Sequence, residues 1–112
     1  MVTHSYIPQR GDFVWLTLDP TRGHEQKGRR PALVLSPIEY NAKAGLILVC
    51  PITSQVKGYP FEAPFLFKGV MNAILVDQIR SVDWRERNIS FIKKCEQSVM
   101  SEVFQKLLLI LE

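Results

Sequence analysis

Hydrophobic and polar residues alternate with a period of two over most of the chain, which is the pattern of half-buried β-strands. The clearest example is "DFVWLTL" at 12–18, in which the odd-numbered side chains face opposite to the even-numbered ones. In the "LILVCPIT" segment, Pro51 reduces the end of the strand to an edge or a bulge. The strands expected after the first one are 32–35, 46–53, 61–67, 70–76, 78–82 and 89–92.

The last segment changes to a period of three and four residues, which predicts a helix with a wide apolar face. Its apolar positions are Val99, Met100, Val103, Phe104, Leu107, Leu108 and Leu111. Ser98 is the expected N-cap, and residues 37–45 predict one helical turn that ends near Gly45. Several short strands followed by one C-terminal helix predict a strongly bent antiparallel sheet or a small β-barrel.

The C-terminal helix is apolar beyond this one face. Leu109 and Ile110 extend the apolar surface around its end. An apolar terminus on a chain this small is expected to be buried, either against a second subunit or on the barrel itself.

The composition is that of a folded globular chain with a single domain. The 112 residues are 46% hydrophobic and 22% charged, which allows one modest core over residues 1–112. No stretch is apolar for the length of a signal peptide or a membrane span. Cys50 and Cys95 form no C-x-x-C pair and are expected to be reduced structural thiols. These features predict a cytoplasmic protein with no membrane association.

The net charge of +3 is concentrated in one loop. Between Arg22 and Arg30 there are four Lys or Arg residues and one acidic residue, Glu25, so this loop alone carries +3. The remaining ten basic and ten acidic residues cancel. Such a loop is typical of contact with a polyanion such as RNA, although a solvated surface loop has the same composition.

The chain has none of the common catalytic motifs. His4 and His24 are isolated from other metal-binding residue types, so no metal site is expected. No phosphate-binding glycine loop or nucleophile elbow occurs, and no cofactor is predicted. Trp84, in the charged turn "DWRER", could stack on a base or fill the core, and the core is favoured.

Three segments together closely resemble the MazF/PemK (Kid) family of toxins from toxin–antitoxin modules. They are "RGDFVWLTLDPTRGHEQKGRRPALVLSP", "CPITSQVKGYPFE" and "LVDQIRSVDWRER", and the likeness runs from about Tyr6 to the end of the chain. The resemblance implies a homodimeric, SH3-like or plug-shaped β-barrel that cleaves single-stranded RNA at short sequence motifs. It also implies inhibition by a cognate antitoxin, which is expected to use a flexible acidic segment.

The resemblance also implies which residues are catalytic. Arg30 takes the place of the family's catalytic arginine, Thr53 that of its catalytic threonine, and Glu25 matches an acidic loop residue beside them. The sequence "CPITS" leaves Ser54 as an alternative source of the active hydroxyl.

The expected reaction needs no activated water because RNA carries its own nucleophile, the 2′-OH. A guanidinium can bind two phosphate oxygens and stays charged, so Arg30 suits the stabilisation of the transition state. Pro31 biases Arg30 toward extended backbone, which would hold the guanidinium in place. Glu25 could accept the 2′-OH proton, with His24 as the titratable alternative. Which residue is the general base and which the general acid stays open.

Single-stranded RNA is recognised through stacking and base edges as well as phosphates. The candidates for RNA binding are His24, Lys27, Arg29, Lys57 with Tyr59 of the same segment, Asp77, Gln78 and Arg80, with Asp77 more suited to bracing the site. The sequence does not predict the RNA motif that is cleaved.

Two other functions fit a small barrel with this charge pattern. Toxins with similar barrels trap DNA gyrase and have no active site, and a supercoiling assay beside an RNA digest separates that function from cleavage. A non-catalytic RNA-binding barrel would bind RNA and give no product. The arrangement of Arg30, Pro31 and Thr53 favours the ribonuclease.

Overall fold

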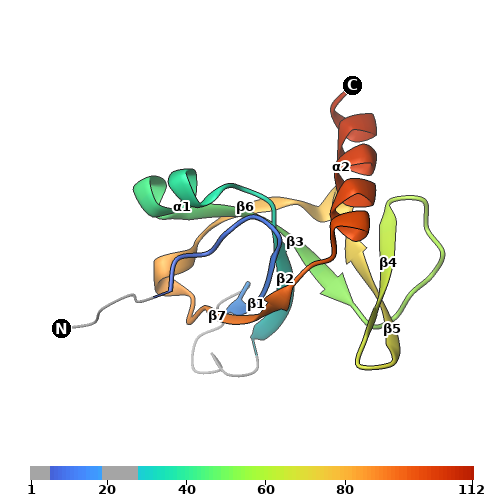
Figure 1. Cartoon of the computed structure of the whole chain (residues 1–112), viewed down its shortest axis with the longest axis horizontal. Coiled ribbons are helices and arrows are strands. Elements are labelled where there is room, and N and C mark those ends of the chain that lie inside the picture. The colour runs from blue at the N-terminus through green and yellow to red at the C-terminus, as the bar shows by residue number, and fades with distance from the viewer. Residues whose placement is uncertain (1–5, 19–27) are drawn as a thin grey trace.

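The computed structural model describes residues 6–18 and 28–112, and its described strands form a curled antiparallel sheet beside a C-terminal helix (Figure 1). The strands are β1 (Asp12–Thr17), β2 (Arg29–Val34), β3 (Leu46–Thr53), β4 (Glu62–Phe67), β5 (Val70–Leu75), β6 (Arg80–Asp83) and β7 (Ser90–Lys94). Their order in the sheet is β4-β5-β3-β2-β1-β7, and β6 pairs with β3. The helices are α1 (Ile38–Ala44) and α2 (Gln97–Leu111), with 3₁₀ turns η1 (Val76–Gln78) and η2 (Trp84–Glu86).

Strand β3 connects two parts of the sheet because it changes partner along its length. Its first half pairs with β6, from Leu46 opposite Asp83 to Val49 opposite Arg80. Its middle pairs with β2 and its last two residues, Ile52 and Thr53, pair with β5. The chain bends at this change of partner, and the bend brings the end of β3 next to η1 and β4.

The apolar residues of β1 and β2 belong to two separate cores, one on each side of these strands. The first core packs against α2 and β5 and contains Phe13, Leu33, Cys50, Ile74, Met100 and Val103. The second lies on the opposite side, beside β6 and η2, and contains Val14, Leu16, Ala32, Val34, Ile47, Val49 and Trp84. Because both sides are covered, the strands are buried on two faces and form a rigid support for whatever lies at their ends.

The last strand of the sheet closes against the first. β7 pairs with β1, and Lys94 Nζ lies 2.5 Å from the Oδ1 atom of the buried Asp12 carboxylate. The same carboxylate accepts hydrogen bonds from the Tyr6 hydroxyl and the Gln9 amide. Burial and the neighbouring carboxylate raise the pKa of Tyr6, so its hydroxyl stays protonated and continues to donate.

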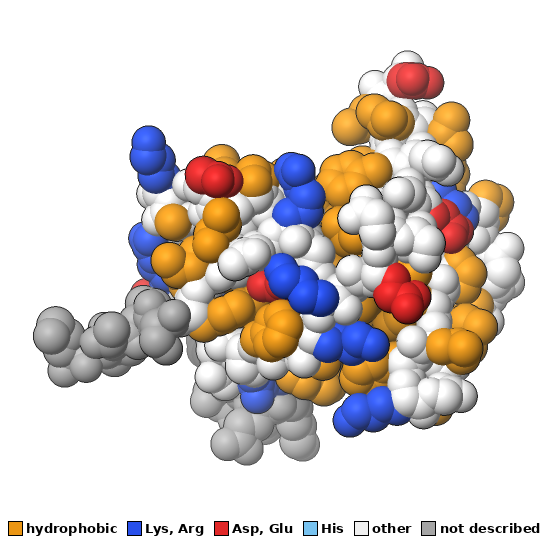
Figure 2. Space-filling view, viewed as in Figure 1, with side chains coloured by type: hydrophobic (Ala, Val, Ile, Leu, Met, Phe, Trp, Pro, Cys, Tyr) orange, Lys and Arg blue, Asp and Glu red, His pale blue; other side chains and the backbone are white. Residues whose placement is uncertain are grey.

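Helix α2 covers the first core with its N-terminal half and extends beyond the sheet with its C-terminal half (Figure 1). Met100 and Val103 are buried. Leu108, Leu109, Ile110 and Leu111 are exposed, and hydrophobic side chains lie along the projecting helix in the space-filling view (Figure 2). No helix in the described ranges is long and apolar enough to cross a membrane.

Several sequence predictions of local structure are confirmed. α1 ends at Gly45, which has the left-handed φ of 69° that allows a helix to stop there. Trp84 is buried in the second core and its indole nitrogen donates to the Asn41 carbonyl at 2.9 Å. Cys50 and Cys95 are free thiols.

Other predicted boundaries are wrong. β2 begins at Arg29 rather than at residue 32, because Arg29 and Arg30 pair with Thr17 and Leu16 of β1. Gln78 belongs to a 3₁₀ turn, so the following strand starts two residues later than predicted. Ser98 is not the N-cap of α2: the helix begins at Gln97, and the cap position has no side-chain hydrogen bond. The expectation of an edge or a bulge at Pro51 is wrong: Pro51 pairs with Ala32, and the two residues that follow it pair with β5.

Candidate functional site

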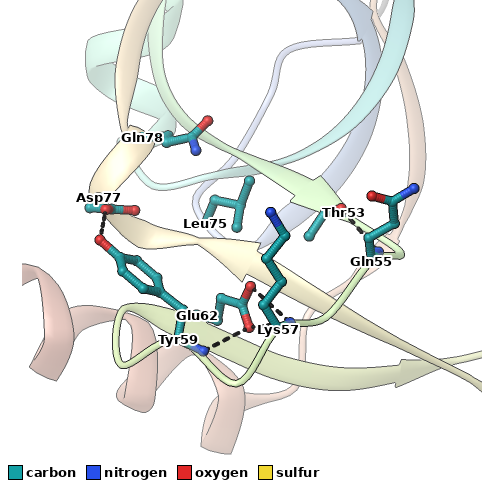
Figure 3. A pocket seen from close by; sticks show the side chains of 8 residues that line it. All are labelled: Thr53, Gln55, Lys57, Tyr59, Glu62, Leu75, Asp77 and Gln78. Carbon is teal, nitrogen blue, oxygen red and sulfur yellow. Dashed lines mark hydrogen bonds between the residues drawn. The ribbon is translucent and has the colours of Figure 1, made fainter.

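A polar pocket of about 500 Å³ lies where β3 ends, between the loop that follows it and the η1 turn. Its lining comes from β3, β4, β5, η1 and the 54–61 loop and consists of Thr53, Gln55, Lys57, Tyr59, Glu62, Leu75, Asp77 and Gln78 (Figure 3). Five of the residues proposed from the sequence, Thr53, Lys57, Tyr59, Asp77 and Gln78, are therefore brought together.

Thr53 lines this pocket and Ser54 does not. The Thr53 Oγ1 atom accepts a hydrogen bond from the Gln55 amide at 3.0 Å, which fixes the hydroxyl oxygen at the strand end. Its hydroxyl proton remains available for a ligand oxygen. Of the two hydroxyls considered from the sequence, Thr53 is the one positioned toward the pocket.

One wall of the pocket is closed by Tyr59 and Asp77. The Tyr59 hydroxyl donates to Asp77 Oδ2 at 2.5 Å (Figure 3). The rings of Tyr59 and Phe61 pack edge to face with their centroids 6.0 Å apart. The hydrogen bond to Asp77 raises the pKa of Tyr59. Asp77 therefore braces the wall, as expected from the sequence, and its charge is partly satisfied there.

Behind this wall lies the buried Cys50 thiol, which is 3.8 Å from the Val76 carbonyl oxygen. Burial, with a smaller contribution from the Asp77 charge, raises the pKa of Cys50 to about 12. The thiol is protonated at neutral pH and has no role as a nucleophile.

The charges in the pocket do not simply favour anions. Lys57 is one cation beside the two carboxylates Glu62 and Asp77. Glu62 is buried and accepts three backbone amides, and Asp77 accepts the Tyr59 hydroxyl. The other polar groups are amides and a hydroxyl, which can donate and accept hydrogen bonds at base edges.

Arg29 and Arg80 donate hydrogen bonds near the two ends of the 19–27 segment. Arg29 Nη2 donates to Ser90 Oγ at 2.5 Å and to the Asn88 carbonyl at 3.2 Å. Arg80 Nη2 donates to the Leu18 carbonyl at 3.0 Å. Both predicted RNA-binding arginines therefore have structural contacts, and both lie outside the pocket lining.

Arg30 is exposed at the start of β2 and also lies outside the pocket lining. The β2–β3 register pairs Ala32 with Pro51. If this antiparallel register is continued by two residues, the Arg30 backbone lies opposite Thr53. At that point β3 already pairs with β5. The guanidinium Nη1 donates to the Arg29 carbonyl at 3.1 Å.

Three predicted site residues, His24, Glu25 and Lys27, lie outside the described residues. Across 6–18 and 28–112, no three His, Cys, Asp or Glu side chains gather in a way that could hold a metal ion.

Sequence reasoning missed three of the lining residues, Gln55, Glu62 and Leu75. Glu62 occupies a strand position that would ordinarily point a charge to solvent, yet it is 5% exposed. The only signal in the sequence is the glycine of "KGYPFE", which allows a tight turn four residues before the carboxylate.

Comparison with known proteins identifies the family. The model of the PemK-like, MazF-like toxins of type II toxin–antitoxin systems matches residues 9–111. The chain belongs to this toxin family. The resemblance noted from the sequence is thereby confirmed, and it covers both the pocket and the arginine-bearing strand ends.

The relatives include proteins named as ribonucleases. The chain is 49% identical over 82 residues to the endoribonuclease toxin MazF of Escherichia coli K12, covering 73% of this chain and 74% of the relative. It superposes on a crystal structure of MazF from Deinococcus radiodurans with a TM-score of 0.84 and 47% identity, covering 96% and 98% of the two chains. A MazE-MazF crystal structure from the same organism gives a TM-score of 0.83 at 42% identity, covering 96% and 97%.

These likenesses confirm the predicted fold class, a mainly β, small antiparallel barrel-like sheet with a C-terminal helix. The toxin family and its named endoribonuclease members are likewise as expected.

Proposed function

We propose that this toxin is a sequence-specific endoribonuclease that cuts single-stranded messenger RNA without a metal and so inhibits translation. The observation that supports it most directly is the polar pocket at the end of β3, which Thr53 lines. A pocket of about 500 Å³ falls in the usual range for sites that bind small ligands. Its amide and hydroxyl groups suit one splayed base with its sugar.

The proposed chemistry divides the work between the pocket and the strand end. The pocket, with Gln78, Lys57 and Asp77, orients one nucleotide. Thr53 hydrogen-bonds the scissile phosphate, and Arg30 stabilises the charge that develops on the phosphate oxygens. Arg29, Arg80, Lys27 and His24 contact neighbouring phosphates or bases, in addition to the loop contacts of the first two.

The attacking group in this proposal is the 2′-OH of the RNA. Its oxygen forms a bond to phosphorus while the bond to the 5′-oxygen of the next nucleotide breaks. Glu25 accepts the 2′-OH proton, and the leaving 5′-oxygen takes up a proton. The products are a 2′,3′-cyclic phosphate and a free 5′-hydroxyl, and no cofactor takes part.

This reaction type is tested with an RNA oligonucleotide that carries one 2′-deoxy sugar just 5′ of the scissile phosphate. We expect it to bind about as well as the all-ribose RNA, because phosphates and bases are unchanged. It should not be cut, whereas the control is cut in excess EDTA and ends in a cyclic phosphate. Cleavage of the deoxy RNA, or activity that magnesium restores after EDTA, overturns this mechanism.

The proposed partner is a cognate antitoxin with a flexible acidic segment. The toxin is proposed to be a homodimer of this single domain, residues 1–112, and to act in the cytoplasm, where its RNA substrate is made. The basic residues between Arg22 and Arg30 support this because they are complementary to an acidic peptide. Charge reversal at Lys27 and Arg29 should weaken both antitoxin and RNA binding. Unchanged antitoxin affinity would exclude this loop as its docking site.

A further inference from the structure

The Glu62 side chain organises the turn that carries Lys57 and Tyr59. Its Oε1 atom accepts hydrogen bonds from three consecutive backbone amides, those of Lys57 at 3.1 Å, Gly58 at 3.0 Å and Tyr59 at 3.3 Å (Figure 3). Oε2 also lies 3.3 Å from the Lys57 amide. A single buried carboxylate thus fixes the backbone of the whole turn.

A buried carboxylate near a site for RNA is unfavourable unless its charge is compensated. Here the three amides supply that compensation, because each directs the positive end of its dipole at the carboxylate. Gly58 makes the arrangement possible with its φ of +76°, which side-chain-bearing residues rarely adopt. The burial of Glu62 is therefore tied to one conformation of the turn.

The turn directs two side chains at the pocket. The Lys57 side chain extends from it into the pocket, past Leu75 and toward Thr53 (Figure 3). The Tyr59 side chain is held at two points. Its hydroxyl donates to Asp77, and its ring packs edge to face with the Phe61 ring. A half-exposed ring that is fixed in this way suits a base-stacking surface.

The backbone of Glu62 is also held, by a lysine of α2. Lys106 Nζ of α2 donates to the Glu62 backbone carbonyl at 2.8 Å and lies 3.1 Å from the Glu102 carboxylate. The start of β4 is thus attached to α2, and the turn rests on a rigid support.

We propose that Glu62 is a positioning residue for RNA: it presets the 57–59 turn so that Lys57 meets a phosphate and the Tyr59 ring stacks on a base. The inference rests on the proposed ribonuclease function. Glu62 does not reach the reacting atoms in this proposal, so its loss should weaken substrate binding and leave the chemical step almost intact.

The first test compares Glu62→Ala with Glu62→Gln. Glu62→Ala should raise KM about tenfold, equivalent to about 1.4 kcal/mol, with kcat within about twofold of wild type because the reacting groups are intact. Glu62→Gln keeps an oxygen that can accept the same amides, so it should recover most of the loss. Glu39→Gln, on exposed α1, removes the same charge far from the pocket and is the matched control.

The second test changes the turn without touching the carboxylate. A Cβ added at Gly58 would meet nothing within 4 Å, so a substitution there changes backbone preference alone. Asn tolerates positive φ and Val does not, so Gly58→Val should raise KM and Gly58→Asn should stay close to wild type. This pair decides the matter even if Glu62→Ala does not fold, because the turn lies on the surface.

The outcomes separate the two proposals. If wild type cuts RNA while folded Glu62→Ala and Gly58→Val keep the wild-type KM, the positioning inference is overturned and the ribonuclease proposal stands. If both Glu62 variants lose kcat alike, the carboxylate acts in the reaction and the inference is again wrong. If wild type cuts no RNA of any sequence, the proposed function itself fails.

Discussion

Arg30 is exposed at the start of β2, outside the lining of the polar pocket. It is paired with Leu16 of β1, so its backbone is held by the sheet rather than by the 19–27 loop. Pro31 follows where β2 pairs with β1 alone, since the β2–β3 pairs begin at Ala32. A missing amide is tolerated at such a position, and the proline restrains the residue before it.

We expect Arg30→Ala to retain the fold and to lose about 10²–10³-fold in kcat, or about 2.7–4 kcal/mol, the scale for removing one preorganised donor. Arg30→Lys should recover little of this, because an ammonium cannot contact two phosphate oxygens at once. Single-turnover cleavage of a defined RNA measures both. A near wild-type rate in Arg30→Ala would remove this residue from the mechanism.

Cys50 predicts a specific alkaline instability. Burial raises its pKa from 9.0 to about 12, so the folded state holds its proton more tightly than the unfolded chain does. Its contribution to stability is therefore complete below pH 9 and is lost as the pH rises from 9 toward 12. Urea unfolding across this range should show the decline, and Cys50→Ala should flatten it. A Cys50→Ala curve with the wild-type slope would assign the decline to other groups, such as Tyr6.

At the level of elements, arginine side chains restrain the described residues on both sides of the 19–27 segment. Arg87 Nη1 donates to the carbonyls of Thr17 at 3.0 Å and Leu18 at 2.6 Å, and its Nε donates to Asp83 at 2.7 Å. Arg29 holds the other stem to the start of β7. The described residues on both sides of the 19–27 segment are therefore held by the sheet.

Arg87→Ala should lower the free energy of unfolding by about 1–3 kcal/mol, because the Thr17 and Leu18 carbonyls lose a charged hydrogen-bond donor. Asp83→Asn is the matched control: it removes the ion pair and keeps the carbonyl contacts. Since Asp83 is half exposed, the control should be close to neutral. Chemical denaturation measures both variants, and equal losses would show that the ion pair, and not the carbonyl contacts, matters.

The period-two pattern predicted the strands because successive side chains of a strand face opposite sides of the sheet, but it could not predict where pairing begins. β2 starts at Arg29 because β1 continues opposite it, which is a long-range contact invisible to local sequence. For the site, turn and strand-end residues such as Thr53 and Asp77 could be named. Glu62 could not, because its burial depends on a turn conformation that alternation does not encode.

At the level of the whole molecule, the projecting end of α2 has no cover from the described part of the chain. Leu109 is 65% and Leu111 73% exposed. Apolar side chains in a continuous stretch of this kind favour association, and the proposed homodimer would bury them.

Leu108→Glu combined with Leu111→Glu should therefore shift the protein from dimer to monomer, because a charge at such an interface is left without a partner. Ser101→Glu adds a charge at an exposed position near the start of the same helix and serves as the control. Sedimentation velocity over a range of concentrations distinguishes the two states. A double variant that remains dimeric would place the interface elsewhere.

The pairing of β7 with β1 has a consequence for synthesis. Asp12 is made early, yet the strand that pairs beside it and the lysine that meets its carboxylate come only near residue 94, and α2 follows after that. A growing chain on the ribosome can pair β1 with β2 and β2 with β3, but its first core stays open until the helix emerges. The toxin thus completes its sheet only after β7, and its first core only after α2, has been synthesised.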